Sequence, residues 1–326
     1  MKMECLVTRL LCPAILTCAA FAAGLDRQAP TTIKVDVNMV IVPVLVADKG
    51  GKPIPALRKR DFHVFENGKE QKIAELIPGA DPFHVALMID SSGSTFFRQD
   101  EMQNAAIAFL GAMRPQDRIM IVTFDRETRF DTGFTSNRES LRRAIRLPHP
   151  EGGQTRLFDA LEQVHERLSS ASGRKAIVLF SDGVDNTSQQ ADEAGTLRMA
   201  EQSDVIIYAV QYDTRRSRLP DRFQVPMPPG YATFNELYSR AVRYLRNLTA
   251  QSGGRVCSAG SLIALKDAFA QIAGELQRQY TLCYYPSDPP RDGSFRRIRV
   301  SVDYPGVTVR TRAGYRPVAG EKERNP

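Results

Sequence analysis

The stretch His84-Val-Ala-Leu-Met-Ile89, followed at once by Asp90-Ser-Ser-Gly-Ser94, decides how this chain folds. A short and nearly continuous apolar run predicts a strand that is buried on both faces, which is typical of a parallel sheet. Three similar runs follow at residues 118–124, 175–180 and 205–210. The sequence therefore predicts an open sheet whose two faces are both covered.

Amphipathic stretches separate these runs. In residues 98–113, for example, Met102, Ala106 and Phe109 recur at helical spacing. Helices are also predicted at residues 138–146, 156–169, 189–202, 235–251 and 262–279. Short apolar strands that alternate with helices predict an α/β fold with a doubly wound, mostly parallel sheet. In such sheets ligands bind at the carboxyl ends of the strands, so the functional residues are expected there.

The sequence patterns at both ends of the chain predict β structure. Residues 31–80 are rich in β-branched residues and contain Asn67-Gly68, a strong hairpin signal. Residues 281–317 contain three further candidate strands, and residues 318–326 are a polar tail. Each group has too few strands for a stable sandwich. We therefore expect the two segments to pair, so that residues 84–280 are inserted in a split β domain. Two independent β appendages are the alternative.

The first 24 residues have the features of a secretory signal peptide. Lys2 and Arg9 give a basic start, an apolar stretch runs from residue 10 to 21, and small residues follow. We predict an exported protein of the periplasm, the cell surface or the medium. The alternatives are a buried N-terminal helix and a lipid anchor at Cys18. The apolar stretch is too short for a stable span, and no transmembrane helix is expected in the mature chain.

Composition places the chain among ordinary globular proteins of about two domains. It has 326 residues, of which 42% are hydrophobic and 25% are charged. The net charge of +7 is mild and no long basic run carries it, so nucleic acid is not an expected partner. Outside the signal peptide, Cys257 and Cys283 are the two cysteines. In an oxidising compartment they suggest one disulfide, and two buried thiols are the alternative.

Polar side chains cluster where the buried strands end. Asp90, Ser92 and Ser94 are spaced two residues apart after the first of these strands. Thr155 precedes a helix and Asp182 follows a later strand, so both are expected at the same edge of the sheet. Carboxylate and hydroxyl oxygens are hard donors that suit Mg²⁺ or Mn²⁺ and do not suit Zn²⁺. So few charged ligands would leave the metal open to a carboxylate from outside.

The pattern Asp90-x-Ser92-x-Ser94, then Thr155, then Asp182 resembles the metal-ion-dependent adhesion site of von Willebrand factor type A domains. The resemblance covers about residues 84–280. It implies that the aspartate and the two serines of the first motif hold the metal. It also implies that Thr155 and Asp182 bind directly or through water, and that a Glu or Asp of a partner protein fills the sixth position.

The segments that flank this domain resemble a narrower group. Asp61-Phe-His-Val-Phe-Glu-Asn-Gly68 and Gln279-Tyr-Thr-Leu-Cys-Tyr-Tyr-Pro286 resemble exported bacterial proteins with a von Willebrand factor A-related domain, known especially from acidobacteria.

Alternative roles remain open for the candidate metal ligands, for Asp125 and for the arginines of a long loop. Asp, Ser and Thr often cap helices and turns, so a purely structural role is the alternative for the whole set. Asp125 follows the second buried strand and either supports the metal ligands from behind or caps a turn. Residues 213–234 form a long loop in which Arg215, Arg216 and Arg218 are expected to steer an acidic partner to the metal. A solvated, variable loop is the alternative there.

The expected function is divalent-metal-dependent protein binding, as an adhesion or interaction module. No dinucleotide-binding, P-loop or nucleophile-elbow motif occurs, and the four histidines lack zinc-ligand spacing, so no enzyme activity is predicted. One alternative is a structural scaffold of the envelope whose metal site is vestigial. A metal-assisted phosphatase is less favoured, because no general base or second set of metal ligands is visible.

Overall fold

The computed structural model describes residues 39–79, 81–92, 99–148, 154–212, 233–288 and 293–317. The predicted signal peptide, Ser94, the three arginines of the 213–234 loop and the polar tail lie outside the described residues. Val37–Pro326 form one compact unit.

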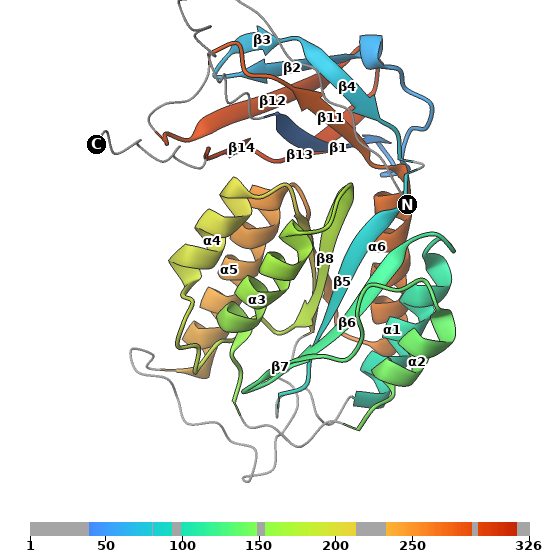
Figure 1. The fold of residues 1–326 in the computed structure, drawn as a ribbon, viewed down its shortest axis with the longest axis vertical. Helices are drawn as coiled ribbons and strands as arrows, with labels where there is room; N and C mark the ends of the chain where they lie inside the picture. Colours follow the sequence, from blue (N-terminus) through green and yellow to red (C-terminus); the bar gives the residue numbers. More distant parts are fainter. Residues whose placement is uncertain are drawn as a thin grey trace, which may run out of the picture. The chain divides into compact units, whose positions relative to one another are not determined.

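A six-stranded sheet lies at the centre of the α/β part, in the strand order β10-β9-β8-β5-β6-β7 (Figure 1). Its strands are β5 (Phe83–Asp90), β6 (Arg118–Phe124), β7 (Thr128–Phe130), β8 (Arg174–Ser181), β9 (Ile206–Tyr212) and β10 (Val256–Ala259). All neighbours run parallel except the edge strand β7, which pairs antiparallel with β6. β5 lies between β6 and β8, so Asp90 ends a strand that has partners on both sides.

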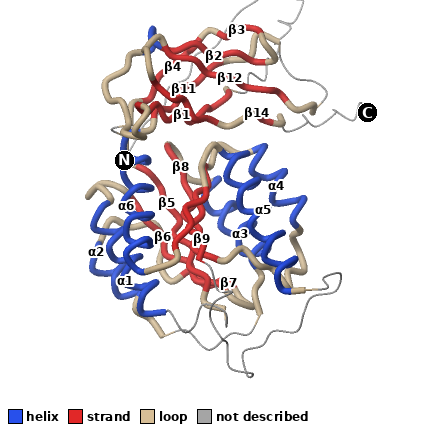
Figure 2. Tube along the Cα trace, turned by 180° about the vertical axis from the view of Figure 1, so that it is seen from behind, coloured by secondary structure: helices blue, strands red, loops and turns tan. Residues whose placement is uncertain are grey.

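Helices cover both faces of this sheet, as Figures 1 and 2 show. One face carries α1 (Gln99–Ala112), α2 (Arg138–Ile145) and α6 (Leu262–Arg278), and the other carries α3 (Leu157–Ser169), α4 (Glu193–Gln202) and α5 (Phe234–Ser252). A separate apolar core lies under each layer. Phe109 of α1 and Phe269 of α6, for example, approach to 5.4 Å between ring centroids. The predicted doubly wound α/β fold is confirmed.

The remaining strands form two antiparallel sheets of four strands. Their bounds are β1 (Val40–Asp48), β2 (Phe62–Glu66), β3 (Lys69–Gln71), β4 (Ile73–Ile77), β11 (Tyr280–Tyr284), β12 (Arg296–Val302), β13 (Val307–Thr311) and β14 (Gly314–Tyr315). A 3-10 turn, η1 (Lys59–Asp61), precedes β2. The sheet orders are β13-β1-β11-β4 and β14-β12-β2-β3. Strands from the two ends of the chain are therefore neighbours in both sheets.

The two sheets share one apolar core. Phe62 of β2 packs edge-on against Tyr280 of β11, with ring centroids 5.2 Å apart. Glu66 is also buried there, and its Oε2 accepts hydrogen bonds from the hydroxyls of Tyr284 at 2.6 Å and Tyr315 at 3.1 Å. The boundaries of a separately folding β domain stay a prediction.

One buried arginine forms hydrogen bonds with both segments that connect the β sheets to the α/β part. Arg174 donates to the backbone carbonyl oxygens of Asp81 at 2.9 Å, Leu276 at 3.0 Å and Gln279 at 2.6 Å. Its guanidinium also lies over the ring of Phe83, 3.9 Å from the centroid. Burial lowers the pKa of Arg174 to about 10.

The two cysteines are free thiols, so a Cys257–Cys283 disulfide, one of the two alternatives weighed above, is not present in this structure. The physical reason is their placement: Cys257 lies on β10 in the core against α6, whereas Cys283 lies on β11 opposite Ile41 in a different sheet. Burial raises the pKa of both thiols, that of Cys283 to about 11.

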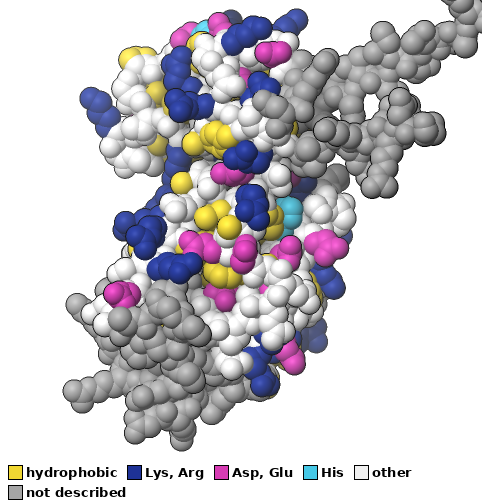
Figure 3. Space-filling model, turned by 90° about the vertical axis from the view of Figure 1, so that its left-hand side faces the viewer, with side chains coloured by type: hydrophobic (Ala, Val, Ile, Leu, Met, Phe, Trp, Pro, Cys, Tyr) yellow, Lys and Arg dark blue, Asp and Glu magenta, His cyan; other side chains and the backbone are white. Residues whose placement is uncertain are grey.

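Two further observations concern the surface and the helices. On the face shown in Figure 3, Lys and Arg side chains are interspersed with Asp and Glu. In the part of the chain that the structure describes, no helix is both long and apolar enough to cross a membrane.

Candidate metal centre

The predicted site residues that the structure describes lie where β5 and β8 end. Asp90 is the last residue of β5, Ser92 lies two residues beyond it, and Asp182 follows the last residue of β8. These three side chains and Thr155 are all at most 5% exposed. Burial of four small polar side chains at one sheet edge is costly unless they satisfy one another or bind a ligand.

Asp90 is the most buried of them, with 0% exposure. Its Oδ1 accepts the backbone N–H of Ser92 at 3.0 Å, and its Oδ2 accepts the hydroxyl of Ser181 at 2.7 Å. Burial and the negative charge of Asp182 raise the pKa of Asp90 to about 7, although the hydrogen bonds from the two serines act in the opposite direction. Asp90 and Asp182 therefore repel each other at buried positions, where the solvent screens charges only weakly.

Asp182 is fixed from two sides. Its Oδ1 accepts the backbone N–H of Val184 at 3.0 Å, and its Oδ2 accepts the hydroxyl of Tyr238 at 3.2 Å. Gly183 between them has φ +84°, and a Cβ on it would lie 2.7 Å from Leu245 of α5. Sequence reasoning missed both Ser181 and Tyr238. Ser181 could have been predicted because it directly precedes Asp182. Tyr238 could not, because it lies on a helix that no sequence motif connects to the site.

Thr155 is positioned by its backbone. Its N–H donates to Oδ1 of Asn186 at 2.8 Å, and its carbonyl oxygen accepts the N–H groups of Asn186 at 3.1 Å and Thr187 at 3.3 Å. These hydrogen bonds therefore join the loop that carries Thr155 to the loop that follows Asp182.

Asp125 makes the turn contact expected from one of its two alternatives, and a role in supporting the metal ligands stays a prediction. Its Oδ1 accepts the N–H of Glu127 at 2.9 Å, and its Oδ2 lies 2.8 Å from Nη2 of Arg129. The same Arg129 nitrogen donates to the hydroxyl of Ser91 at 3.1 Å. Asp125 therefore reaches the loop of Ser92 through Arg129.

The donor set fits a hard divalent cation better than a soft one. Among the described residues, no group of three or more His, Cys, Asp and Glu side chains is placed to hold a metal. A metal at this edge would instead use the two carboxylates together with the hydroxyl oxygens of Ser92 and Thr155. Oxygen ligands without nitrogen or sulfur are those that Mg²⁺ and Mn²⁺ prefer.

Comparison with known proteins gives a family for this region. A family profile described as von Willebrand factor type A domain matches residues 85–184. No curated protein matches the sequence.

Several solved structures are similar in fold. A von Willebrand factor type A protein from Catenulispora acidiphila is 14% identical, with a TM-score of 0.47, 88% of this chain covered and 74% of that one. Proximal thread matrix protein 1 from the mussel byssus, with a zinc-occupied MIDAS motif, is 16% identical, with a TM-score of 0.46 and coverage of 65% and 49%. The vWF domain of the pilus tip protein Mfa5 from Porphyromonas gingivalis is 14% identical, with a TM-score of 0.41 and coverage of 59% and 94%.

The match in this chain spans about half the length of the mussel protein. The narrower bacterial group suggested by the flanking segments stays a prediction. The family profile begins in β5 and ends just after Asp182, so it contains every residue of the predicted metal site. Over residues 85–184, the α/β part of this chain therefore resembles a von Willebrand factor type A domain.

Proposed function

We propose that this protein is a divalent-metal-dependent protein-binding module that works outside the cytoplasm. Asp90, Ser92, Ser94, Thr155 and Asp182 would hold Mg²⁺ or Mn²⁺, and a Glu or Asp of a partner protein would complete the coordination. The observation that carries this proposal is the fully buried Asp90 beside the charge of Asp182. The features of residues 1–24 support export.

The electrostatics explain why a metal and a partner would bind together. Two buried carboxylates repel each other, and a divalent cation removes that repulsion. The other proposed protein ligands are neutral hydroxyls, so the two carboxylates only balance the charge of the cation, and a third carboxylate can still bind it as a ligand. We propose that the domain binds and does not catalyse, because the resemblance implies a coordination position for a partner carboxylate and the sequence carries no dinucleotide-binding, P-loop or nucleophile-elbow motif.

The first test is the unfolding free energy of the mature protein in Mg²⁺ or Mn²⁺ against EDTA. A ligand that binds only the folded state stabilises it by about 2.7 kcal/mol at a hundredfold excess over its Kd. We expect such a rise in the wild type and in Asp288→Asn, which removes an exposed aspartate far along the chain from the site. Asp90→Asn is expected to lose the rise while remaining folded in EDTA, since it removes a buried charge and keeps the side-chain shape.

The same proteins separate the proposed function from its alternatives. If Mg²⁺ and Mn²⁺ leave the unfolding free energy of the wild type unchanged, the scaffold with a vestigial metal site is favoured. Turnover of a generic phosphate ester that disappears in Asp90→Asn would instead favour the phosphatase.

A further inference from the structure

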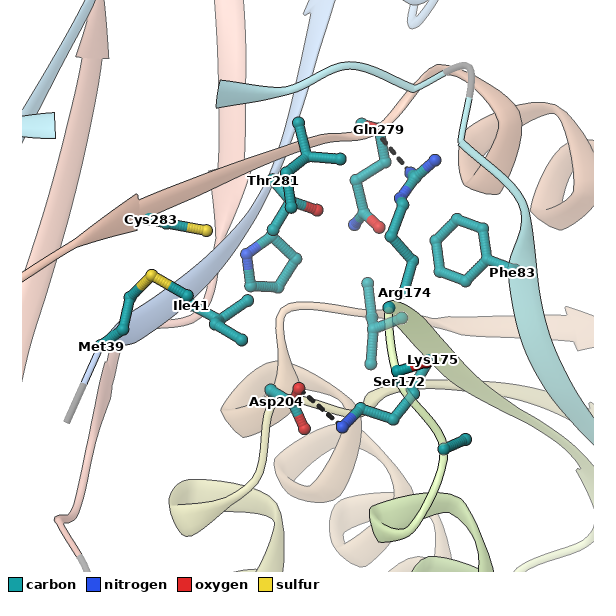
Figure 4. Close-up of a pocket in the computed structure, with 15 residues that line it drawn as sticks. Met39, Ile41, Phe83, Ser172, Arg174, Lys175, Asp204, Gln279, Thr281 and Cys283 are labelled. Carbon is teal, nitrogen blue, oxygen red and sulfur yellow. Dashed lines mark hydrogen bonds and ion pairs between the residues drawn. The ribbon is translucent and has the colours of Figure 1, made fainter. Parts of the chain in front are cut away.

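A cavity lies where β5, β8 and β9 begin, at the edge of the sheet opposite the metal centre. Its volume is about 260 Å³. Figure 4 shows side chains from β1, β11 and the start of β8 converging on it. The walls are mainly apolar and include Met39, Ile41, Pro43, Ile77, Phe83 and Ile206.

One buried amide in this cavity has an unused donor. Gln279 is 1% exposed, and among the described residues its Nε2 has no hydrogen-bond partner. In Figure 4 the side-chain amide of Gln279 points into the cavity, away from the backbone carbonyl of the same residue, which accepts a hydrogen bond from Arg174. A buried donor without an acceptor is costly, so this nitrogen favours a ligand that carries an acceptor oxygen.

The charges of the lining favour an anion. Arg174, Lys175 and Asp204 are its charged members, so two cations face one carboxylate. The Lys175 ammonium lies 2.9 Å from Asp204, and this ion pair closes one side of the cavity in Figure 4. The hydrogen bonds of Arg174 described above go to uncharged backbone carbonyls, while the carboxylates of Asp81 and Asp117 favour its charged form from a distance.

The size and the walls define the rest of the ligand. An apolar protein cavity of about 150 Å³ binds benzene, so this larger cavity has room for a ring or a short alkyl chain together with a carboxylate. We propose that the cavity binds a small monocarboxylate, whose apolar body packs against Ile41, Phe83 and Ile206 and whose carboxylate accepts the Nε2–H of Gln279. This site is separate from the metal centre and does not depend on it.

The experiment titrates benzoate and hexanoate into the mature protein and follows isoleucine and methionine methyl signals by NMR. Benzyl alcohol and 1-hexanol serve as uncharged probes of similar size. We expect saturable shifts at the methyl groups of Ile41 and Met39, with the carboxylates binding at least about tenfold more tightly than the alcohols. The shifts should be the same in Mg²⁺ and in EDTA.

Two variants test the hydrogen-bond donor of Gln279 and the volume of the cavity separately. Gln279→Leu keeps the approximate shape and removes the donor, so carboxylate binding should weaken at least about tenfold, the loss expected for a hydrogen bond to a charged group. Ile41→Phe fills the cavity and should weaken the acids and the alcohols alike. Gln271→Leu, the same change at an exposed position of α6, should bind as the wild type does.

Three results would overturn the proposal. The first is a titration without saturable shifts for either acid, which would leave a cavity that holds only water. The second is equal binding of acids and alcohols, and the third is an affinity that Gln279→Leu leaves unchanged while the variant's spectrum shows a folded protein.

Discussion

At the scale of single residues, a carboxylate outside the predicted ligand set holds the loop that follows Asp182. Asp159 lies in the first turn of α3 and is 5% exposed. Its Oδ1 accepts the backbone N–H groups of Gln190 and Ala191, both at 2.9 Å, and its Oδ2 accepts that of Gln189 at 3.0 Å. The sequence motif predicted Asp90 and Asp182, but not this role, because backbone donors leave no signature in the side-chain pattern.

Asp159→Ala should therefore destabilise the protein by about 1.5–3 kcal/mol, since three backbone N–H groups of the loop after β8 lose a charged acceptor. Burial acts to raise the pKa of Asp159, but the hydrogen bonds outweigh it and the pKa lies below 3.8. A depressed pKa contributes stability above the unfolded value, and this contribution is lost as the pH falls through the folded value. Urea unfolding should show the full difference at pH 7 and a smaller one below about pH 4. A constant difference across this range would contradict the argument, and Asp288→Ala is the control.

At the scale of elements, apolar runs predicted the strands well and capping chemistry set the helix ends. The run at residues 118–124 is β6 without any shift. The helix expected from residue 189 begins at Glu193, because the N–H groups before it go to Asp159 and Asp192 caps the first turn. Sequence reasoning missed β10, whose four residues Val-Cys-Ser-Ala form no apolar run. Its place at the sheet edge depends on a close approach of two backbones.

That approach requires glycine at position 254. A Cβ there would lie 1.9 Å from the carbonyl oxygen of Ile207 in β9, and backbone cannot move aside as a side chain can. Gly254→Ala should cost about 3 kcal/mol or more in unfolding free energy, because β10 would have to separate from β9. Gly260→Ala is the matched control, since a Cβ there meets nothing within 4 Å. Chemical denaturation of both variants tests this, and equal stabilities would show that β10 tolerates the displacement.

At the scale of the whole molecule, two arginines that directly follow strands β13 and β14 bind the end of α4. Arg312 is 3% exposed, and it donates to the backbone carbonyls of Ser203 at 2.6 Å, of Glu201 and of Gly314 at 2.7 Å. Arg316 adds an ion pair to Glu201 at 3.1 Å. The pairing of the chain ends was predictable, because each end had too few strands to stand alone. These arginine contacts were not, since their acceptors are backbone carbonyls.

Arg312→Met should lower the free energy of unfolding by about 2–4 kcal/mol, because the last carbonyls of α4 lose a positively charged donor. We expect calorimetry to resolve two transitions for the variant and one for the wild type, because the β sheets and the α/β part lose a shared contact in the variant. Arg297→Met is the control, because Arg297 is exposed on β12. A single transition at the wild-type temperature would mean that Arg312 does not couple the two parts.

The pairing of strands from both chain ends also has a consequence for the order of folding. The hydroxyl of Thr311 donates to the carbonyl oxygen of Pro43, which is 268 residues away along the chain. Closing so long a loop in an unfolded chain costs entropy, but the cost falls once the intervening residues have folded and brought the two ends together. On a ribosome, β1 and β2 emerge early and keep unpaired edges until β11 and β12 follow. Because unpaired strand edges promote aggregation, this waiting period is when the nascent chain most needs protection by a chaperone.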